Sequence, residues 1–221
     1  GSTLAGALIR QLAAEADGGR IVAISRRPAP TPGAAVHWIT CDYSEQHIAS
    51  TCAELMTYQG SVQRVYLFNG QLHNTDLLPE KRLEDISLKA LQRSFAVNAF
   101  GPILLARTLL PLLDSKRRIV FASLSARVGS IQDNHLGGWY SYRASKAAQN
   151  QLLRTLAIET RRRLPNLTVL ALHPGTTDTP LSQPYQRNVP EGKLFSAERS
   201  AHQLAAIIDN AGENDHGRFV A

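Results

Sequence analysis

The stretch YSYRASK, residues 140–146, opens a helical pattern that runs to about residue 163. A hydrophobic run, residues 118–122 (RIVFA), precedes it, and a second, residues 167–172 (LTVLAL), follows it. Short apolar runs on either side of a long helix are typical of a strand–helix–strand unit with parallel strands. The stretch therefore predicts an α/β fold.

Within this stretch, Tyr142 and Lys146 are four residues apart, so their side chains lie on the same face of the predicted helix. An ammonium group beside a phenol favours the phenolate, and we expect it to lower the pKa of the tyrosine from its usual value of about 10. A phenol with such a pKa can exchange a proton with a substrate oxygen. A surface Tyr–Lys pair has the same spacing, so the rest of the chain must decide between the two interpretations.

Strand-like and helix-like segments alternate along the whole chain. The predicted strands are residues 20–25, 35–41, 64–68, 118–122, 167–172 and 218–220, and the predicted helices are 7–14, 45–58, 88–113, 140–163 and 197–210. Residues 76–84 and 182–195 are polar and are predicted to be loops. The alternation predicts one Rossmann-type domain over residues 1–221, a doubly wound parallel sheet between two helical layers, with ligands at the carboxyl ends of the strands.

The composition fits one soluble globular domain, because the 221 residues are 43% hydrophobic and 19% charged. No continuous apolar run approaches the roughly 20 residues that span a bilayer, and no signal-peptide pattern opens the chain. Cys41 and Cys52 lack metal-ligand spacing and are too few for a disulfide framework, which favours a reducing cytoplasm. The net charge of +6 is scattered, and its densest cluster, residues 161–163, falls at a helix end where cations stabilise the dipole. A nucleic-acid partner is therefore not expected.

Two segments near the start indicate a dinucleotide site. Residues 1–6 (GSTLAG) lead directly into a helix, and such glycine-bearing loops hold a pyrophosphate with backbone N–H groups and the helix dipole. The hydrophobic strand that normally precedes this loop is absent, so either the first strand is missing from the sequence or the likeness is accidental. Arg26 and Arg27 follow the next predicted strand, where arginines accommodate the 2′-phosphate of NADP and an acidic residue would bind the ribose of NAD. NADP(H) is therefore the preferred cofactor.

With these motifs in order, the sequence resembles a short-chain dehydrogenase/reductase (SDR) over essentially its whole length. The resemblance rests on Tyr142-x-x-x-Lys146, Asn98 in the preceding helix, a serine after residues 118–122, Asn69-Gly70, and Pro174-Gly175 with Thr179. The run SARVGSI at residues 125–131, followed by GGWY at 137–140, is most similar to the C-factor-like subgroup of predicted NADP-dependent oxidoreductases.

The resemblance implies a role for each catalytic residue. Tyr142 would be the general acid that protonates a carbonyl oxygen as hydride arrives at the carbon. Lys146 would lower the pKa of the tyrosine and hold the nicotinamide ribose. Asn98 would bend its helix and hold a water that links Lys146 to solvent.

The family's serine, which hydrogen-bonds the substrate carbonyl, has three candidates here. Ser125 is the expected one, and Ser123 and Ser130 remain alternatives. The ambiguity arises because Ala126 occupies the position where a count back from Gly129 places the family's serine.

The resemblance also implies cofactor contacts from the glycine loop and from several strand ends. The expected residues are Gly1, Ser2, Thr3, Leu4, Ala5, Arg26, Arg27, Asp42, Asn69, Gly70, Tyr142, Lys146, Pro174, Gly175, Thr177 and Thr179. The loop departs from the family's G-x-x-x-G-x-G because Leu4 or Ala5 stands near the middle glycine, where a side chain would crowd the pyrophosphate. Asn69-Gly70 retains only one asparagine of the family's N-N-A-G.

We therefore expect a cytoplasmic NADP(H)-dependent oxidoreductase that interconverts a small carbonyl compound and its alcohol. Helices 88–113 and 141–163 would form a homodimer or homotetramer, and no metal, nucleic-acid or membrane partner is expected. Trp139, Tyr140 and His73 are predicted near the substrate, with residues 181–195 as a lid. A non-catalytic, cofactor-binding signalling protein is the main alternative, favoured by the degenerate glycine loop. An extended sugar-nucleotide epimerase is disfavoured because too few residues follow Lys146.

Overall fold

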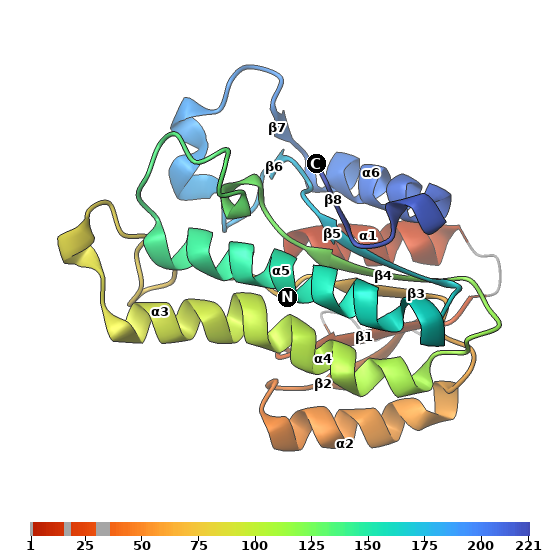
Figure 1. Ribbon diagram of the computed structural model, residues 1–221. Coiled ribbons are helices and arrows are strands. Elements are labelled where there is room, and N and C mark those ends of the chain that lie inside the picture. The colour runs from red at the N-terminus through yellow and green to blue at the C-terminus, as the bar shows by residue number, and fades with distance from the viewer. Residues whose placement is uncertain (1, 16–18, 30–35) are drawn as a thin grey trace.

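The computed structural model describes residues 2–15, 19–29 and 36–221. Its helices are α1 (Thr3–Ala14), α2 (Glu45–Leu55), α3 (Leu88–Phe95), η3 (Ala96–Phe100), α4 (Gly101–Leu109), α5 (Tyr140–Arg163) and α6 (Ala197–Asn210), with short turns η1 (Met56–Tyr58), η2 (Leu83–Asp85), η4 (Leu110–Leu112), η5 (Arg127–Gly129), η6 (Gln183–Asn188) and η7 (Glu213–Asp215). Its strands are β1 (Ile21–Ser25), β2 (Val36–Thr40), β3 (Arg64–Leu67), β4 (Ile119–Leu124), β5 (Leu167–Leu172), β6 (Thr176–Thr177), β7 (Leu194–Phe195) and β8 (Arg218–Val220). The predicted α/β class is confirmed (Figure 1).

All the paired strands named above run parallel. The largest sheet has the order β3-β4-β5-β8, in which Ser123 of β4 pairs with Leu67 of β3 and with Ala171 of β5. Parallel pairing places the carboxyl ends of these strands at one edge, which the sequence predicts to be the ligand edge.

The sheet is divided, which differs from the single sheet expected. β1 and β2 pair only with each other, and within the described residues no strand joins β1 to β3. The break falls where a doubly wound fold places the strand before the glycine loop, and the sequence contains no strand there. The short pair β6–β7 also lies inside segments that were expected to be irregular.

Helices cover both faces of the large sheet because side chains alternate along its strands. In β4, Ile119 and Phe121 pack with α4 and α5, whereas Val120 and Ala122 pack with α1 and α6. Figure 1 shows the two groups of helices on opposite sides of the sheet. The core is therefore two apolar layers with the sheet between them.

Two predicted helices have different limits. Helix α1 begins at Thr3 rather than residue 7, because Ser2 caps it by accepting a hydrogen bond from the Ala5 N–H at 3.4 Å. The predicted helix 88–113 is continuous but changes type, with a π-helical turn over Ala96–Phe100.

The segment Leu88–Leu112 is long and apolar, although polar residues interrupt it so that it contains no continuous apolar run of that length. It is 25 residues long and contains an 18-residue stretch with a mean hydropathy of 1.5, which is enough in length and composition to cross a membrane. A core helix of a layered domain passes the same test, and this segment packs against α2 and α5. We interpret it as a core helix.

Candidate active site

Tyr142 and Lys146 lie on the buried face of α5, as their spacing predicts. Their exposed fractions are 8% and 2%, so the pair is not the surface pair of the alternative interpretation. The Lys146 Nζ lies 6.0 Å from the centre of the Tyr142 ring. The two groups therefore form one buried unit near the carboxyl edge of the sheet.

The pKa shift of Tyr142 has the opposite direction from the one expected. Burial raises the pKa of Tyr142 to about 12, and burial lowers the pKa of Lys146 to about 7. Near pH 7 only about half of the Lys146 side chains carry the charge that would favour the phenolate. Desolvation thus outweighs the ammonium in this structure, and Tyr142 remains a neutral phenol at physiological pH.

Asn98 sits in the middle of the π-helical turn and is fully buried. Its Oδ1 accepts a hydrogen bond from the Gln71 N–H at 2.7 Å, and its Nδ2 donates to the Gln71 carbonyl at 2.9 Å. Nδ2 also donates to the Ser145 Oγ at 3.0 Å, and Ser145 donates to the Tyr142 carbonyl at 2.8 Å. The widened turn therefore connects the loop after β3 to the backbone of the helix that carries Tyr142.

The Lys146 ammonium has two hydrogen-bond acceptors. Nζ lies 2.9 Å from the Leu124 carbonyl and 2.9 Å from the Gln149 Oε1. Gln149 was not identified from the sequence. The available signal was its position three residues after Lys146 on a face that is otherwise filled by Leu153 and Leu156.

The three candidate serines all have other partners. Ser123 accepts a hydrogen bond from the Gln149 Nε2 at 2.7 Å, and Ser125 donates to the Asn150 Oδ1 at 2.6 Å. Ser130 accepts the Asp133 N–H at 3.2 Å. Among the described residues, none of these hydroxyls is bonded to Tyr142, so the choice of Ser125 stays a prediction.

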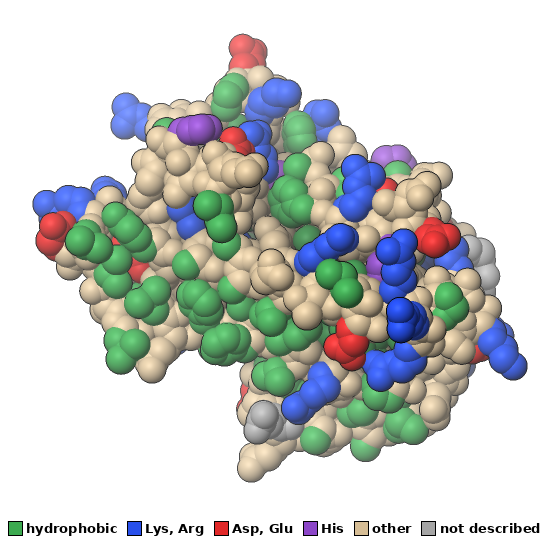
Figure 2. Space-filling model, viewed as in Figure 1, with side chains coloured by type: hydrophobic (Ala, Val, Ile, Leu, Met, Phe, Trp, Pro, Cys, Tyr) green, Lys and Arg blue, Asp and Glu red, His purple; other side chains and the backbone are tan. Residues whose placement is uncertain are grey.

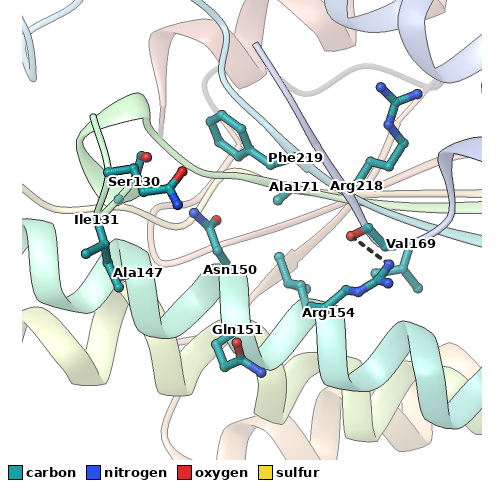
Figure 3. Close-up of a pocket in the computed structure, with 14 residues that line it drawn as sticks. Ser130, Ile131, Ala147, Asn150, Gln151, Arg154, Val169, Ala171, Arg218 and Phe219 are labelled. Atoms are coloured by element: carbon teal, nitrogen blue, oxygen red, sulfur yellow. Dashed lines mark hydrogen bonds between the residues drawn. The ribbon is translucent and has the colours of Figure 1, made fainter. Parts of the chain in front are cut away.

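Ser130 also lines the cleft drawn in Figure 3, which has a volume of about 430 Å³. The cleft lies between η5, β8 and the middle of α5, where Asn150 and Arg154 project into it. The dashed line in Figure 3 marks the hydrogen bond from Arg154 Nη1 to the Gly217 carbonyl, at 3.5 Å. Tyr142 and Lys146 do not line this cleft, so it is separate from the candidate catalytic centre.

The start of α5 is held by Glu80, a second residue that the sequence did not reveal. Trp139, the N-cap position, has a left-handed φ of 52° and makes no side-chain cap. Instead, the buried Glu80 carboxylate accepts hydrogen bonds from the Ser141 N–H at 3.2 Å and from the Ser141 hydroxyl. The Glu80 carbonyl accepts the Trp139 N–H. A carboxylate at a helix N-terminus also interacts favourably with the dipole, so Glu80 fixes the residues just before Tyr142.

Aromatic side chains from three segments gather beside Tyr142. The ring of Trp139 is 6.3 Å from Tyr142 and 4.9 Å from Tyr185 in η6, measured between centroids. His73 lies 5.7 Å from Tyr185 and bonds the Leu181 carbonyl through Nε2 at 3.1 Å. Trp139 and His73 therefore lie in one cluster near the phenol, whereas Tyr140 is 40% exposed.

The glycine-loop residues Ser2 to Ala5 occupy the N-cap and first turn of α1, and Gly1 lies outside the described residues. Leu4 is only 3% exposed and packs in the core with Val120 and Leu170. The side chain of Leu4 therefore points into the core, and the expectation that Leu4 or Ala5 crowds a pyrophosphate stays a prediction. The backbone N–H groups of Thr3 and Leu4 lie in the first turn of the helix. N–H groups at a helix start are the arrangement that binds phosphate.

The ends of β1 and β2 are exposed. Arg26 and Arg27 follow β1 on the surface, and Arg27 is fixed by its N–H, which donates to Ser25 Oγ at 3.1 Å. Asp42 follows β2 and pairs with His47 at 2.7 Å. Hydrogen bonds from Ser44 lower the pKa of Asp42 to about 2. Asp42 is thus a solvated carboxylate that also supports the start of α2.

The remaining predicted contacts lie after β3 and β5. A Cβ atom on Gly70 would lie 3.7 Å from Lys146 Nζ, so the Asn69-Gly70 turn adjoins the ammonium. Gly175 has a φ of 73°, and a Cβ there would overlap the Phe195 ring at 2.6 Å, so only glycine fits after Pro174.

The two threonines that follow Pro174 and Gly175 have local partners. Thr177 is buried, and its hydroxyl bonds Ser200 at 2.8 Å. The Thr179 hydroxyl donates to the Thr177 carbonyl at 3.4 Å. Thr177 is therefore a structural hydroxyl in this arrangement.

The residues along this edge fit a nicotinamide dinucleotide. A helix N-terminus and two exposed guanidinium groups suit phosphates at one end, and the Lys146 ammonium suits a ribose at the other. The Nδ1 of His173, just after β5, is buried without a hydrogen-bond partner among the described residues.

Comparisons with known proteins identify the family of this chain. Residues 15–211 match a short-chain dehydrogenase family model described as enoyl-(acyl carrier protein) reductase. The chain is 31% identical over 137 residues to C-signal of Myxococcus xanthus, covering 62% of this chain and 77% of that protein. It is 33% identical over 129 residues to 1-hydroxy-2-glutathionyl-2-methyl-3-butene dehydrogenase of a Rhodococcus species, covering 58% of this chain but only 54% of that enzyme.

Among solved structures, an NADPH-bound carbonyl reductase from chicken fatty liver superposes with a TM-score of 0.81 at 20% identity. The superposition covers 99% of this chain and 91% of that one. At this identity the likeness shows the fold. Because the family model spans most of the sequence and C-signal is matched over most of its length, the chain belongs to the short-chain dehydrogenase/reductase family of nicotinamide-dependent oxidoreductases.

Proposed function

We propose that this protein is an NADP(H)-dependent oxidoreductase that interconverts a carbonyl compound and its alcohol, with Tyr142 as the general acid. One observation carries the proposal: a buried phenol and ammonium lie together at the ligand edge of a parallel sheet, on a helix connected to Asn98. Buried titratable groups with shifted pKa values are unfavourable for stability and concentrate at functional sites.

The raised pKa of Tyr142 favours the reductive direction. When bound, the nicotinamide supplies hydride to the carbonyl carbon. Negative charge then develops on the carbonyl oxygen, and a phenol that is still protonated at pH 7 can donate its proton there. Lys146 in its charged form stabilises the phenolate that remains, so reduction should weaken as the pH rises above the Lys146 pKa of about 7.

Arg26 and Arg27 support NADP(H) as the cofactor. Both are exposed at the end of β1, and within the described part of the chain neither belongs to an ion pair. A guanidinium group binds a phosphate bidentately, and an exposed one is free to do so at the adenosine ribose.

The assembly we propose is a homodimer or homotetramer formed through the segment Leu88–Leu112 and α5. Figure 2 shows hydrophobic side chains gathered over the α3–α4 segment and basic side chains over the C-terminal end of α5. Leu88, Phe100 and Ile158 are large apolar residues on these helices with at least half of their surface exposed. The free thiols of Cys41 and Cys52 suit the cytoplasm, where we place the protein.

The test is the loss of NADPH absorbance with a panel of ketones, aldehydes and quinones. Tyr142→Phe should lower kcat by about 10² to 10⁴-fold, because the proton donor is removed while the ring is kept. Tyr140→Phe is the matched control, since Tyr140 lies two residues away and is exposed; its kcat should be unchanged.

A second candidate function is cofactor binding without turnover. The hydrogen bond from Ser125 to Asn150 favours this function, because the serine expected to bind the substrate carbonyl then bonds Asn150 instead. Tight NADPH binding in a calorimeter, with no turnover of any panel member, would establish this alternative in place of the enzyme.

A further inference from the structure

Gln149 is a polar side chain with no exposed surface, set between α5 and β4. It lies three residues after Lys146, so the two side chains share one face of the helix. Burying an amide is unfavourable unless each of its polar atoms is hydrogen-bonded. The partners of Gln149 therefore show what its burial achieves.

The amide bridges the strand and the lysine. Its Nε2 donates to the Ser123 Oγ at 2.7 Å and to the Leu124 carbonyl at 3.1 Å, while its Oε1 accepts from the Lys146 Nζ at 2.9 Å. The reverse orientation is excluded because it would set the NH₂ group against the ammonium and the amide oxygen against the Leu124 carbonyl. The network thus fixes which end of the amide faces Lys146.

We propose that Gln149 is a positioning residue for the catalytic centre: Ser123 and the Leu124 carbonyl lock its amide so that Oε1 holds the Lys146 ammonium beside Tyr142. The proposal rests on the proposed function and assigns Ser123, one of the three candidate serines, to orienting Gln149 instead of binding substrate. It also explains why both Gln149 and Ser123 are fully buried.

The amide oxygen acts against desolvation. Burial alone lowers the pKa of Lys146, and a neutral oxygen in contact with the ammonium favours the charged form. The groups around Nζ from other elements are Gly70 after β3 and the Leu124 carbonyl of β4, and neither titrates.

Two further titratable or charged groups lie near. Tyr142, on the same helix, remains neutral below a pKa of about 12. Arg127 begins the η5 turn, which packs on α5 through Gly129, but Arg127 is exposed and paired with Asp133 at 2.8 Å. Gln149 is therefore the side chain whose hydrogen bond to Nζ favours the charged form of Lys146.

The test measures the titration of Lys146 directly, by NMR of protein labelled with ¹³C at the lysine ε-carbons. Lys146→Met identifies the signal. Gln149→Met keeps the shape and removes the acceptor, so the Lys146 pKa should fall by about one unit; Gln149→Glu brings a carboxylate to the same place, so it should rise by about one unit or more. The fall of reductase activity with pH should move in the same two directions.

Two controls separate this role from simple packing. Gln151→Met changes an exposed glutamine on the same helix and should leave the Lys146 pKa and the pH profile unchanged. Ser123→Ala frees the amide to rotate and should lower the Lys146 pKa by less than Gln149→Met does, which also tests the network should a Gln149 variant fail to fold.

The proposal and the proposed function fail in different ways. Equal Lys146 pKa values in the wild type and in the folded Gln149 or Ser123 variants would overturn the positioning role, whatever the activity. If the Lys146 pKa falls in Gln149→Met and rises in Gln149→Glu, but the protein reduces no carbonyl compound, the positioning role stands and the enzymatic function does not.

Discussion

The two halves of the candidate site are built differently. On the catalytic side, Tyr142, Lys146 and Asn98 are buried, and Gln149 holds the lysine from the protein itself. On the cofactor side, the end of β1 and the start of α1 present exposed side chains and backbone N–H groups. The comparison shows that Lys146 and Asn98, on the proposed catalytic side, are already hydrogen-bonded within the protein, whereas the groups proposed to bind phosphate are exposed.

Solvation explains the difference. A polar group without water must be hydrogen-bonded within the protein, and Asn98 and Lys146 find their partners in the Gln71 backbone and the Leu124 carbonyl. An exposed guanidinium is solvated and needs no such partner. Mutations on the buried side should therefore affect stability and turnover together, and those on the exposed side only binding.

The largest effect is expected for Lys146→Met. Turnover should be lost, because the group that stabilises the phenolate is removed. The free energy of unfolding at pH 7 should rise by about 2 kcal/mol: the pKa shift of Lys146 from 10.5 to about 7 corresponds to at most about 5 kcal/mol, and part is offset by the acceptors left unpaired at Gln149 and Leu124. Chemical denaturation measures this gain, and a less stable variant would contradict it.

The same lysine sets a pH dependence. Below pH 7 Lys146 is charged in both folded and unfolded chains, so its desolvation cost is fully present; between pH 7 and 10.5 only the unfolded chain keeps the proton, so stability should rise with pH. Above about pH 10 the raised pKa values of Tyr66 and Tyr142 reverse the trend, because the unfolded tyrosines ionise first. Lys146→Met should abolish the rise.

Asn98→Ala should lower the free energy of unfolding by about 3 kcal/mol. The change leaves the Gln71 backbone and the Ser145 hydroxyl without their buried partner. Asn166→Ala, which removes one hydrogen bond to the Ser115 carbonyl at the surface, is the control and should cost clearly less. If both variants lose the same free energy of unfolding, the hydrogen bonds of Asn98 contribute no more to stability than one surface hydrogen bond.

Glu80→Ala should cost about 2 kcal/mol of stability and also lower kcat, because the cap on α5 and the partner of Ser141 disappear just before Tyr142. The matched control is Ser87→Ala, which removes the cap of α3 at Ala90. Thermal unfolding of Ser87→Ala should show a similar decrease with no loss of kcat. If kcat is unchanged in Glu80→Ala at temperatures well below its Tm, the cap on α5 contributes to stability and not to catalysis.

The smallest effect is expected on the exposed side. Arg26→Ala combined with Arg27→Ala should raise the KM for NADPH by about 10-fold, since each charged hydrogen bond contributes on the order of 1 kcal/mol at an exposed site. The KM for NADH, kcat and the Tm should be unchanged. An equal rise for both cofactors would place the 2′-phosphate elsewhere.

The sequence predicted three residues of the candidate catalytic centre, whose roles stay a prediction, and it did not reveal the residues that support them. Tyr142, Lys146 and Asn98 were recognised because their spacing is local or belongs to a family motif. Glu80 is 61 residues from Ser141, and this contact depends on the path of a loop that has no periodic pattern. The direction of the Tyr142 pKa shift was predicted wrongly. Burial decides this direction, and the spacing of two residues does not reveal how deeply they are buried.

The start of α1 was predicted wrongly for a local reason. A helix that begins at Thr3 turns Leu4 into the core, whereas a loop over the same residues would have exposed it. Ser2 itself was the signal in the sequence, because a serine before a helical pattern favours a helix start at the next residue.

The π-helical turn at Ala96–Phe100 has a consequence for the length of its segment. An ordinary helix advances 100° per residue, so the one additional residue in this turn offsets the apolar stripe of α3 from that of α4 by about that angle. In this segment the first half packs against α5, and the second half packs against both α2 and α5. Deleting a single residue there would restore a regular helix and rotate one half away from its neighbour, so the number of residues in this turn is as constrained as their identity.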